Sequence, residues 1–195
     1  MASTAKMPRA AALILGAALA LAGCNNDSGD SAPTPSSTKV SASTTSAATT
    51  SKDPEAAIWN PCDIPDSAIS ALGLNAASKD TTVAGVDFTG WKTCSWVSQA
   101  KTYNLGILSS DHTLDESRQR TDYVDYSSTT VGSHRALQFR KPGATYNLNC
   151  WLAIEVPHGI VDFNVMNRYG ASGAGDPCLE VGRLSSALVE YLPAR

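Results

Sequence analysis

The sequence contains few of the residue patterns on which recognisable catalytic or metal sites are built. Only three of its 195 residues are His. The cysteines do not fall into C-x-x-C pairs, and no His stands at ligand spacing from them. There is no G-x-S-x-G turn to expose a serine nucleophile, and the glycines have neither the Rossmann nor the Walker spacing. No motif therefore names a reaction, and we expect no catalytic residue, no metal and no cofactor.

Positive charge and long apolar runs are also scarce. The 15 Lys and Arg residues are outnumbered by 18 Asp and Glu residues, which gives a formal net charge of −3. An acidic chain is a poor match for a phosphate backbone, so no nucleic-acid partner is expected. No apolar run reaches the length of about 20 residues that a membrane-spanning helix needs.

The N-terminal segment has the layout of an export signal. Two basic residues precede an apolar run at residues 10–22, which is too short to cross a bilayer. The run ends in Leu21-Ala22-Gly23-Cys24, which resembles the bacterial lipobox. The resemblance implies cleavage before Cys24 and attachment of acyl chains such as palmitate to that residue. Two or three such chains hold a protein stably on a membrane. The other interpretation is an ordinary secretory signal with a chance cysteine.

We therefore expect residues 1–23 to be a lipoprotein signal peptide and the protein to lie on the extracytoplasmic face of the cell membrane. Removal of this segment changes the formal charge from −3 to −5, so membrane contact should come from the lipid alone. Residues 24–54 are rich in Ser, Thr, Ala and Pro and cannot bury enough surface to fold. They are predicted to form a disordered tether with a reach of about 30 Å. O-glycosylation of its hydroxyl groups is compatible with this composition.

Four cysteines remain once Cys24 carries the lipid: Cys62, Cys94, Cys150 and Cys178. An even number of cysteines in an exported domain suggests two disulfides, for which three pairings are possible. We favour Cys62–Cys94 and Cys150–Cys178, because each closes a moderate loop and ties a helix to a strand. Metal binding by these four residues is the weaker interpretation.

Residues 55–195 are predicted to form one α+β domain, with an antiparallel sheet and the N- and C-terminal helices packed on one face. Three helices are expected. The first ends at Gly73, the second runs from the capping box Thr113–Glu116 to about Tyr123, and the third runs from Asp176 to Pro193. Strands are expected at 91–97, 103–107, 127–131, 135–140, 148–156 and 160–166, with an ambiguous segment at 81–88.

Several short motifs occur in a recognisable order: Trp59-Asn60-Pro61-Cys62, then Leu72-Gly73-Leu74, then Cys94-Ser95-Trp96, and later the Cys150 strand and Cys178 before an amphipathic helix. With the lipobox and the tether, this order resembles the actinobacterial lipoproteins of the DUF3558 family over about residues 55–195. The resemblance implies an envelope lipoprotein and carries no activity or catalytic residues. The layout is also similar to the PsbP-like α+β fold.

Two functions are compatible with these features. The first is a non-catalytic binding or accessory module of the cell envelope, which holds an envelope protein or a small apolar ligand. Trp59 and Trp91 are its binding candidates, because exposed aromatic residues mark contact surfaces, although core packing is an alternative for both. The second is a cell-envelope hydrolase whose site is assembled in space around His112, His134 or His158. We favour the first, since the sequence contains no nucleophile motif.

Overall fold

The structure, a computed structural model, describes residues 57–82 and 85–194. The predictions for the signal peptide, the lipidated Cys24 and the tether to residue 54 lie outside these residues. None of the helices in the described part of the chain is long and apolar enough to cross a membrane.

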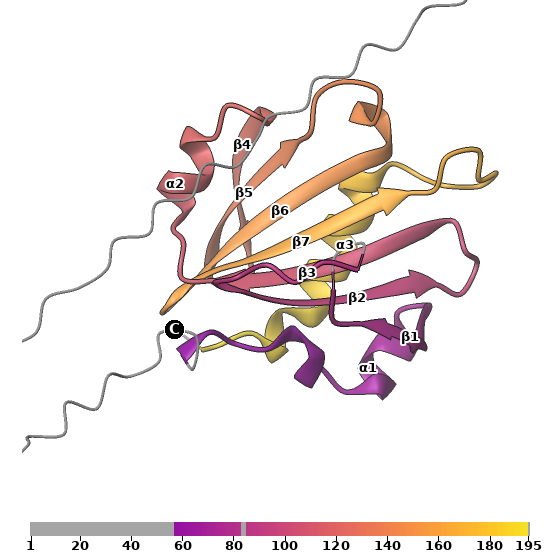
Figure 1. Ribbon diagram of the computed structural model, residues 1–195, viewed down its shortest axis with the longest axis horizontal. Coiled ribbons are helices and arrows are strands. Elements are labelled where there is room, and N and C mark those ends of the chain that lie inside the picture. Colours follow the sequence, from indigo (N-terminus) through magenta and orange to yellow (C-terminus); the bar gives the residue numbers. More distant parts are fainter. Residues whose placement is uncertain (1–56, 83–84, 195) are drawn as a thin grey trace, which may run out of the picture. The chain divides into compact units, whose positions relative to one another are not determined.

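The domain is built on one seven-stranded sheet in which every neighbouring pair is antiparallel (Figure 1). The strand order is β1-β2-β3-β7-β6-β5-β4. The β3–β7 pair joins the three N-terminal strands to the four C-terminal strands. The strands are β1 (Leu74–Asp80), β2 (Trp91–Ser98), β3 (Tyr103–Ser110), β4 (Val124–Val131), β5 (His134–Arg140), β6 (Asn149–Val156) and β7 (Gly159–Asn167).

The described part of the chain also contains three α-helices and three 3-10 turns. The α-helices are α1 (Asp66–Ala71), α2 (Leu114–Gln119) and α3 (Pro177–Leu188). The 3-10 turns are η2 (Pro61–Asp63), η3 (Tyr146–Leu148) and η4 (Val189–Tyr191). The predicted α+β class is therefore confirmed.

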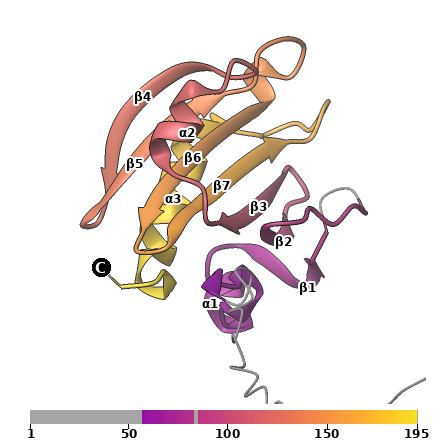
Figure 2. The same cartoon turned by 60° about the vertical axis from the view of Figure 1, so that its left-hand side comes forward.

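The two faces of the sheet carry different helices. The first and last helices, α1 and α3, cover one face, which we call the α1/α3 face, as predicted. Helix α2 lies on the other face, which we call the α2 face (Figure 2). Residues of β6 alternate between them: Leu152 and Ile154 pack toward α3, whereas Trp151 and Ala153 pack toward α2. This alternation follows from the two-residue period of a strand.

Two disulfides fasten helical segments to the sheet. Cys62 in η2 is bonded to Cys94 in β2, and Cys150 in β6 is bonded to Cys178 in α3. These are the two pairings that the sequence favoured. Each bridge fixes a chain segment on the α1/α3 face, where Cys94 and Cys150 are buried.

The segment at 81–88, which the sequence left ambiguous, is not a strand element in its described residues, and the first strand, β1, occupies Leu74–Asp80, where none was predicted. The residues of β1 have weak strand propensity. The strand forms because Leu74 is buried and because β1 pairs with β2. The register shifts between Asn75 and Asp80. Within this irregular stretch Val97 donates its backbone N–H to the Ser78 hydroxyl at 2.9 Å, so a side chain supplies the acceptor.

The second helix is shorter than predicted and ends at Gln119 rather than near Tyr123. Arg120 already has extended backbone angles. Leaving the helix here allows Tyr123 to reach the α2 face, where its ring packs edge-on against Phe139 with the centroids 4.9 Å apart. Strand β4 follows at once from Val124, three residues before the predicted start.

Candidate functional site

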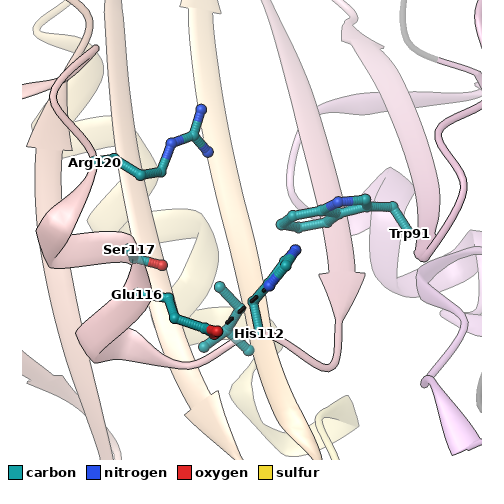
Figure 3. Close-up of a pocket in the computed structure, with 6 residues that line it drawn as sticks. Trp91, His112, Glu116, Ser117 and Arg120 are labelled. Carbon is teal, nitrogen blue, oxygen red and sulfur yellow. Dashed lines mark ion pairs between the residues drawn. The ribbon is translucent and has the colours of Figure 1, made fainter.

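A pocket of about 340 Å³ opens on the α2 face, between α2 and the start of β2 (Figure 3). Its lining consists of Trp91, His112, Glu116, Ser117, Arg120 and Ile160. Strand register places the sheet residues of this set. Trp91 of β2 pairs with Ser110 of β3, which pairs with Ile160 of β7, so the three residues stand at one level on neighbouring strands. Trp91 and Ile160 therefore meet on the same face.

Helix α2 supplies the polar wall of the pocket, and a capping box fixes where the helix begins. Glu116 accepts hydrogen bonds from the backbone N–H of Thr113 at 2.7 Å and from its hydroxyl at 3.0 Å. These bonds, the backbone one first, hold the pKa of Glu116 below its usual range. The Nδ1 atom of His112 lies 3.6 Å from Oε2 of the same carboxylate.

Trp91 and His112 form the aromatic side of the pocket. Their ring centroids are 5.3 Å apart and their planes are inclined by 46°. Figure 3 shows the indole and the imidazole side by side, with Arg120 reaching toward them across the sheet from just beyond the end of α2. A flat apolar group entering the pocket would therefore meet aromatic surface on one side and a cation on the other.

The guanidinium of Arg120 is held by a carboxylate and an aromatic ring. It donates Nε to Asp122 at 3.1 Å and Nη2 to the other oxygen of Asp122 at 2.9 Å. This pairing lowers the pKa of Asp122. The guanidinium carbon also lies 4.4 Å from the centre of the Tyr123 ring. The remaining terminal nitrogen, Nη1, makes no hydrogen bond to another residue of 57–82 or 85–194.

Asp162 is a buried acid on the same face of β7, two residues beyond Ile160. Only 4% of its surface is exposed, and its Oδ1 has no hydrogen-bond partner within the described residues. Burial raises its pKa to about 7, and the positive charge of Arg120 opposes this shift. The carboxyl group is therefore partly protonated at neutral pH.

The geometry supports binding better than nucleophilic catalysis. His112 has a carboxylate neighbour, but the nearby Ser117 hydroxyl donates to the backbone carbonyl of Thr113 at 3.2 Å. The ring of His134 is buried, with Nδ1 2.8 Å from the backbone oxygen of Glu155. His158 is exposed in the turn between β6 and β7. Across residues 57–82 and 85–194, no three His, Cys, Asp or Glu side chains gather as metal ligands would.

The two predicted binding residues do not come together. Trp91 lines the pocket, whereas Trp59 is half-buried and packs against the core of the α1/α3 face. Sequence reasoning missed Arg120, Ile160 and Asp162. Only Asp162 carried a usable signal, since an acid stands within the apolar run of β7.

The family model described as "Protein of unknown function (DUF3558)" matches residues 19–191. The chain belongs to the DUF3558 family. This DUF3558 protein has no match among the curated proteins or among the solved structures. The similarity to the PsbP-like fold stays a prediction.

Proposed function

We propose that this DUF3558 protein is a lipid-anchored, non-catalytic binding module on the extracytoplasmic face of an actinobacterial cell membrane. In this proposal Cys24 carries the lipid, the segment to residue 54 is a tether, and the pocket at Trp91 holds a small ligand. The pocket on the α2 face is the observation that carries the binding role, because it joins aromatic surface to a few polar groups.

Two features support an exported and anchored protein. The sequence Leu21-Ala22-Gly23-Cys24 resembles a lipobox, and both cysteine pairs of the described domain are disulfides, which persist in oxidising compartments. The direct test is cell fractionation of Cys24→Ala. We expect the variant to leave the membrane fraction, and its recovery there at wild-type level would refute the anchor.

The chemistry of the pocket favours a small ligand with a flat or branched apolar part and one polar group. A volume of about 340 Å³ is at the small end of the range of ligand pockets. Trp91 and Ile160 offer apolar contact, and Arg120 offers a hydrogen-bond donor beside them. Such a ligand would bury its apolar part at the sheet and keep its polar group near α2.

The fluorescent probe 1-anilinonaphthalene-8-sulfonate, which joins aromatic rings to an anionic group, tests the pocket. A soluble form exported without the lipid should bind it with raised fluorescence. Trp91→Ala and Arg120→Gln should each weaken this binding about tenfold. The matched controls Arg118→Gln, on the same helix, and Tyr169→Ala, a fully exposed aromatic residue, should bind like the wild type. Equal binding by all four variants would show that the probe does not bind in the pocket and would contradict its assignment as the ligand site.

Hydrolysis is a second candidate, and the 3.6 Å approach of His112 to Glu116 in the pocket is the observation that favours it. A p-nitrophenyl ester serves as the substrate. Hydrolysis that disappears in His112→Ala but not in His158→Ala would support an enzyme. Equal rates in the wild type and in His112→Ala would exclude this site as the catalyst.

A further inference from the structure

The short segment between β1 and β2 exposes apolar side chains next to the point where the described domain begins. Val86 is 53% exposed and Phe88 is 48% exposed, although both are residues that normally avoid water. Trp91 follows Phe88 and is half-buried, and both line a second hollow of about 220 Å³. We call Val86, Phe88 and Trp91 the apolar loop patch.

The backbone holds this patch against the start of β2. Trp91 donates its N–H to the carbonyl of Phe88 at 3.1 Å, which closes a tight turn. Gly90 within that turn has a φ of +80°, a conformation that side chains with a Cβ rarely adopt. Phe88 is therefore presented at a fixed place beside Trp91.

The beginning of the domain is fastened to the same strand. The ammonium group of Lys92 donates to the carbonyl of Ile58 at 2.8 Å, and the disulfide of Cys62 with Cys94 lies two residues further along β2. The chain that leads back to Cys24 therefore joins the domain next to the apolar loop patch. Any lipid carried by Cys24 would hold this end of the domain near the bilayer.

We propose that the apolar loop patch rests on the lipid bilayer to which the protein is anchored. This inference rests on the proposed lipid anchor. Two exposed side chains would bind a membrane weakly from solution. A tether that reaches about 30 Å raises their effective concentration at the surface to the millimolar range, where weak contacts become occupied. Trp91 would lie at the level of the headgroups, where amphipathic rings are favoured.

The acidic side chain of Asp87 lies between Val86 and Phe88 and is exposed. It limits the depth of the contact to the polar boundary and disfavours strongly anionic surfaces. Because Trp91 also lines the pocket on the α2 face, the patch would place one wall of the ligand pocket beside the lipid headgroups. The contact would therefore orient the binding site as well as hold the domain.

The test uses the full-length lipidated protein reconstituted into phosphatidylcholine vesicles that contain brominated acyl chains. Flotation with the vesicles reports the anchor, and quenching of tryptophan emission by bromine reports the patch. We expect quenching in the wild type, and its loss in the double variant Val86→Ser/Phe88→Ser and in Trp91→Phe. The matched double variant Tyr169→Ser/Leu179→Ser removes two more exposed apolar residues elsewhere and should be quenched like the wild type.

The outcomes separate the inference from the anchor. A protein that floats without quenching overturns the inference and leaves the anchor standing. A protein that does not float refutes the anchor and the inference together. A wild-type dimer that Val86→Ser/Phe88→Ser converts to a monomer would assign the patch to a second copy of the chain and would also overturn the inference.

Discussion

Thr113 and Glu116 hold each other at the start of α2. The Glu116 carboxylate accepts the Thr113 backbone N–H at 2.7 Å, and the Thr113 hydroxyl accepts the Glu116 backbone N–H at 3.2 Å. This reciprocal cap fixes a helix of only six residues, which could not persist alone in water. Because the helix carries Glu116 and Ser117 and is followed directly by Arg120, the cap also fixes the polar wall of the pocket.

Replacement of Thr113 by Ala should therefore affect both stability and binding. We expect the free energy of unfolding to fall by about 1 kcal/mol, the usual effect of losing such a cap. Urea denaturation measures this loss, and the affinity for anilinonaphthalene sulfonate should fall with it. Thr121→Ala, an exposed threonine just beyond the helix, is the control and should change neither quantity. Unchanged probe affinity in Thr113→Ala would show that the cap does not position the pocket.

The buried Asp162 should make stability depend on pH. In the unfolded chain its carboxyl titrates near pH 3.9, as Asp usually does, whereas in the folded domain its pKa is raised to about 7. Between these two values the folded state binds more protons than the unfolded state. The contribution of Asp162 to the free energy of unfolding therefore falls as the pH rises from about 4 to 7, and the loss is complete above pH 7.

Asp162→Asn should remove this dependence. We expect the variant to be more stable than the wild type at pH 8, by roughly 2–4 kcal/mol, and to differ little at pH 4. Thermal or urea unfolding at several pH values measures the difference. Asp111→Asn, at an exposed loop position, is the matched control. If the wild type is instead more stable than Asp162→Asn at pH 8, the ionised carboxylate has a stabilising hydrogen-bond or ion-pair partner in the folded protein.

The Cys150–Cys178 bridge should be a major source of stability, because it ties α3 to β6 across 28 residues. On the chain-entropy account, its removal as Cys150→Ser/Cys178→Ser should reduce the free energy of unfolding by about 3–4 kcal/mol. Guanidinium denaturation under oxidising conditions measures the loss. The double variant, rather than a single one, avoids a free thiol. A change below about 1 kcal/mol would show that packing of α3 alone holds the C-terminal segment.

The aromatic cluster of the α2 face should depend on Phe139. Its ring is buried and contacts Tyr123, Tyr126 and Trp151, stacking parallel to the last at 6.2 Å. Phe139→Ala should reduce the free energy of unfolding by about 3–5 kcal/mol. The near-ultraviolet circular dichroism of the cluster should weaken with it. An unchanged spectrum would place these rings in a different arrangement.

Much of the fold follows from local patterns in the sequence. The apolar run Trp151–Ile154 marks β6 as a strand buried on both faces, and the capping box marks the start of α2. The position of β1 does not follow, because residues such as Asn75 and Ser78 become strand only by pairing with β2. The early end of α2 likewise depends on the burial of Tyr123 against strands that are distant in sequence.

The pocket was less accessible to sequence reasoning than the fold. Trp91 could be chosen because it is an aromatic residue near a loop. No local pattern indicated that it lies near Ile160, because the two residues are brought to one level only by the pairing of β2 with β3 and of β3 with β7. In the sequence Arg120 is indistinguishable from an ordinary surface base. Only the end of α2 at Gln119 places it at the pocket. Asp162 is unusual in its strand, yet only the structure shows that its Oδ1 is unpartnered within the described residues.

The central claim is that this DUF3558 protein holds a small ligand in the pocket at Trp91. The most direct measurement is native mass spectrometry of the protein purified gently from its own membrane. The account predicts a non-covalent adduct on the wild type and on Arg118→Gln, which is lost from Trp91→Ala and Arg120→Gln. An adduct that persists in both pocket variants, or a wild type that carries none even when its native membrane extract is added back, would contradict the account.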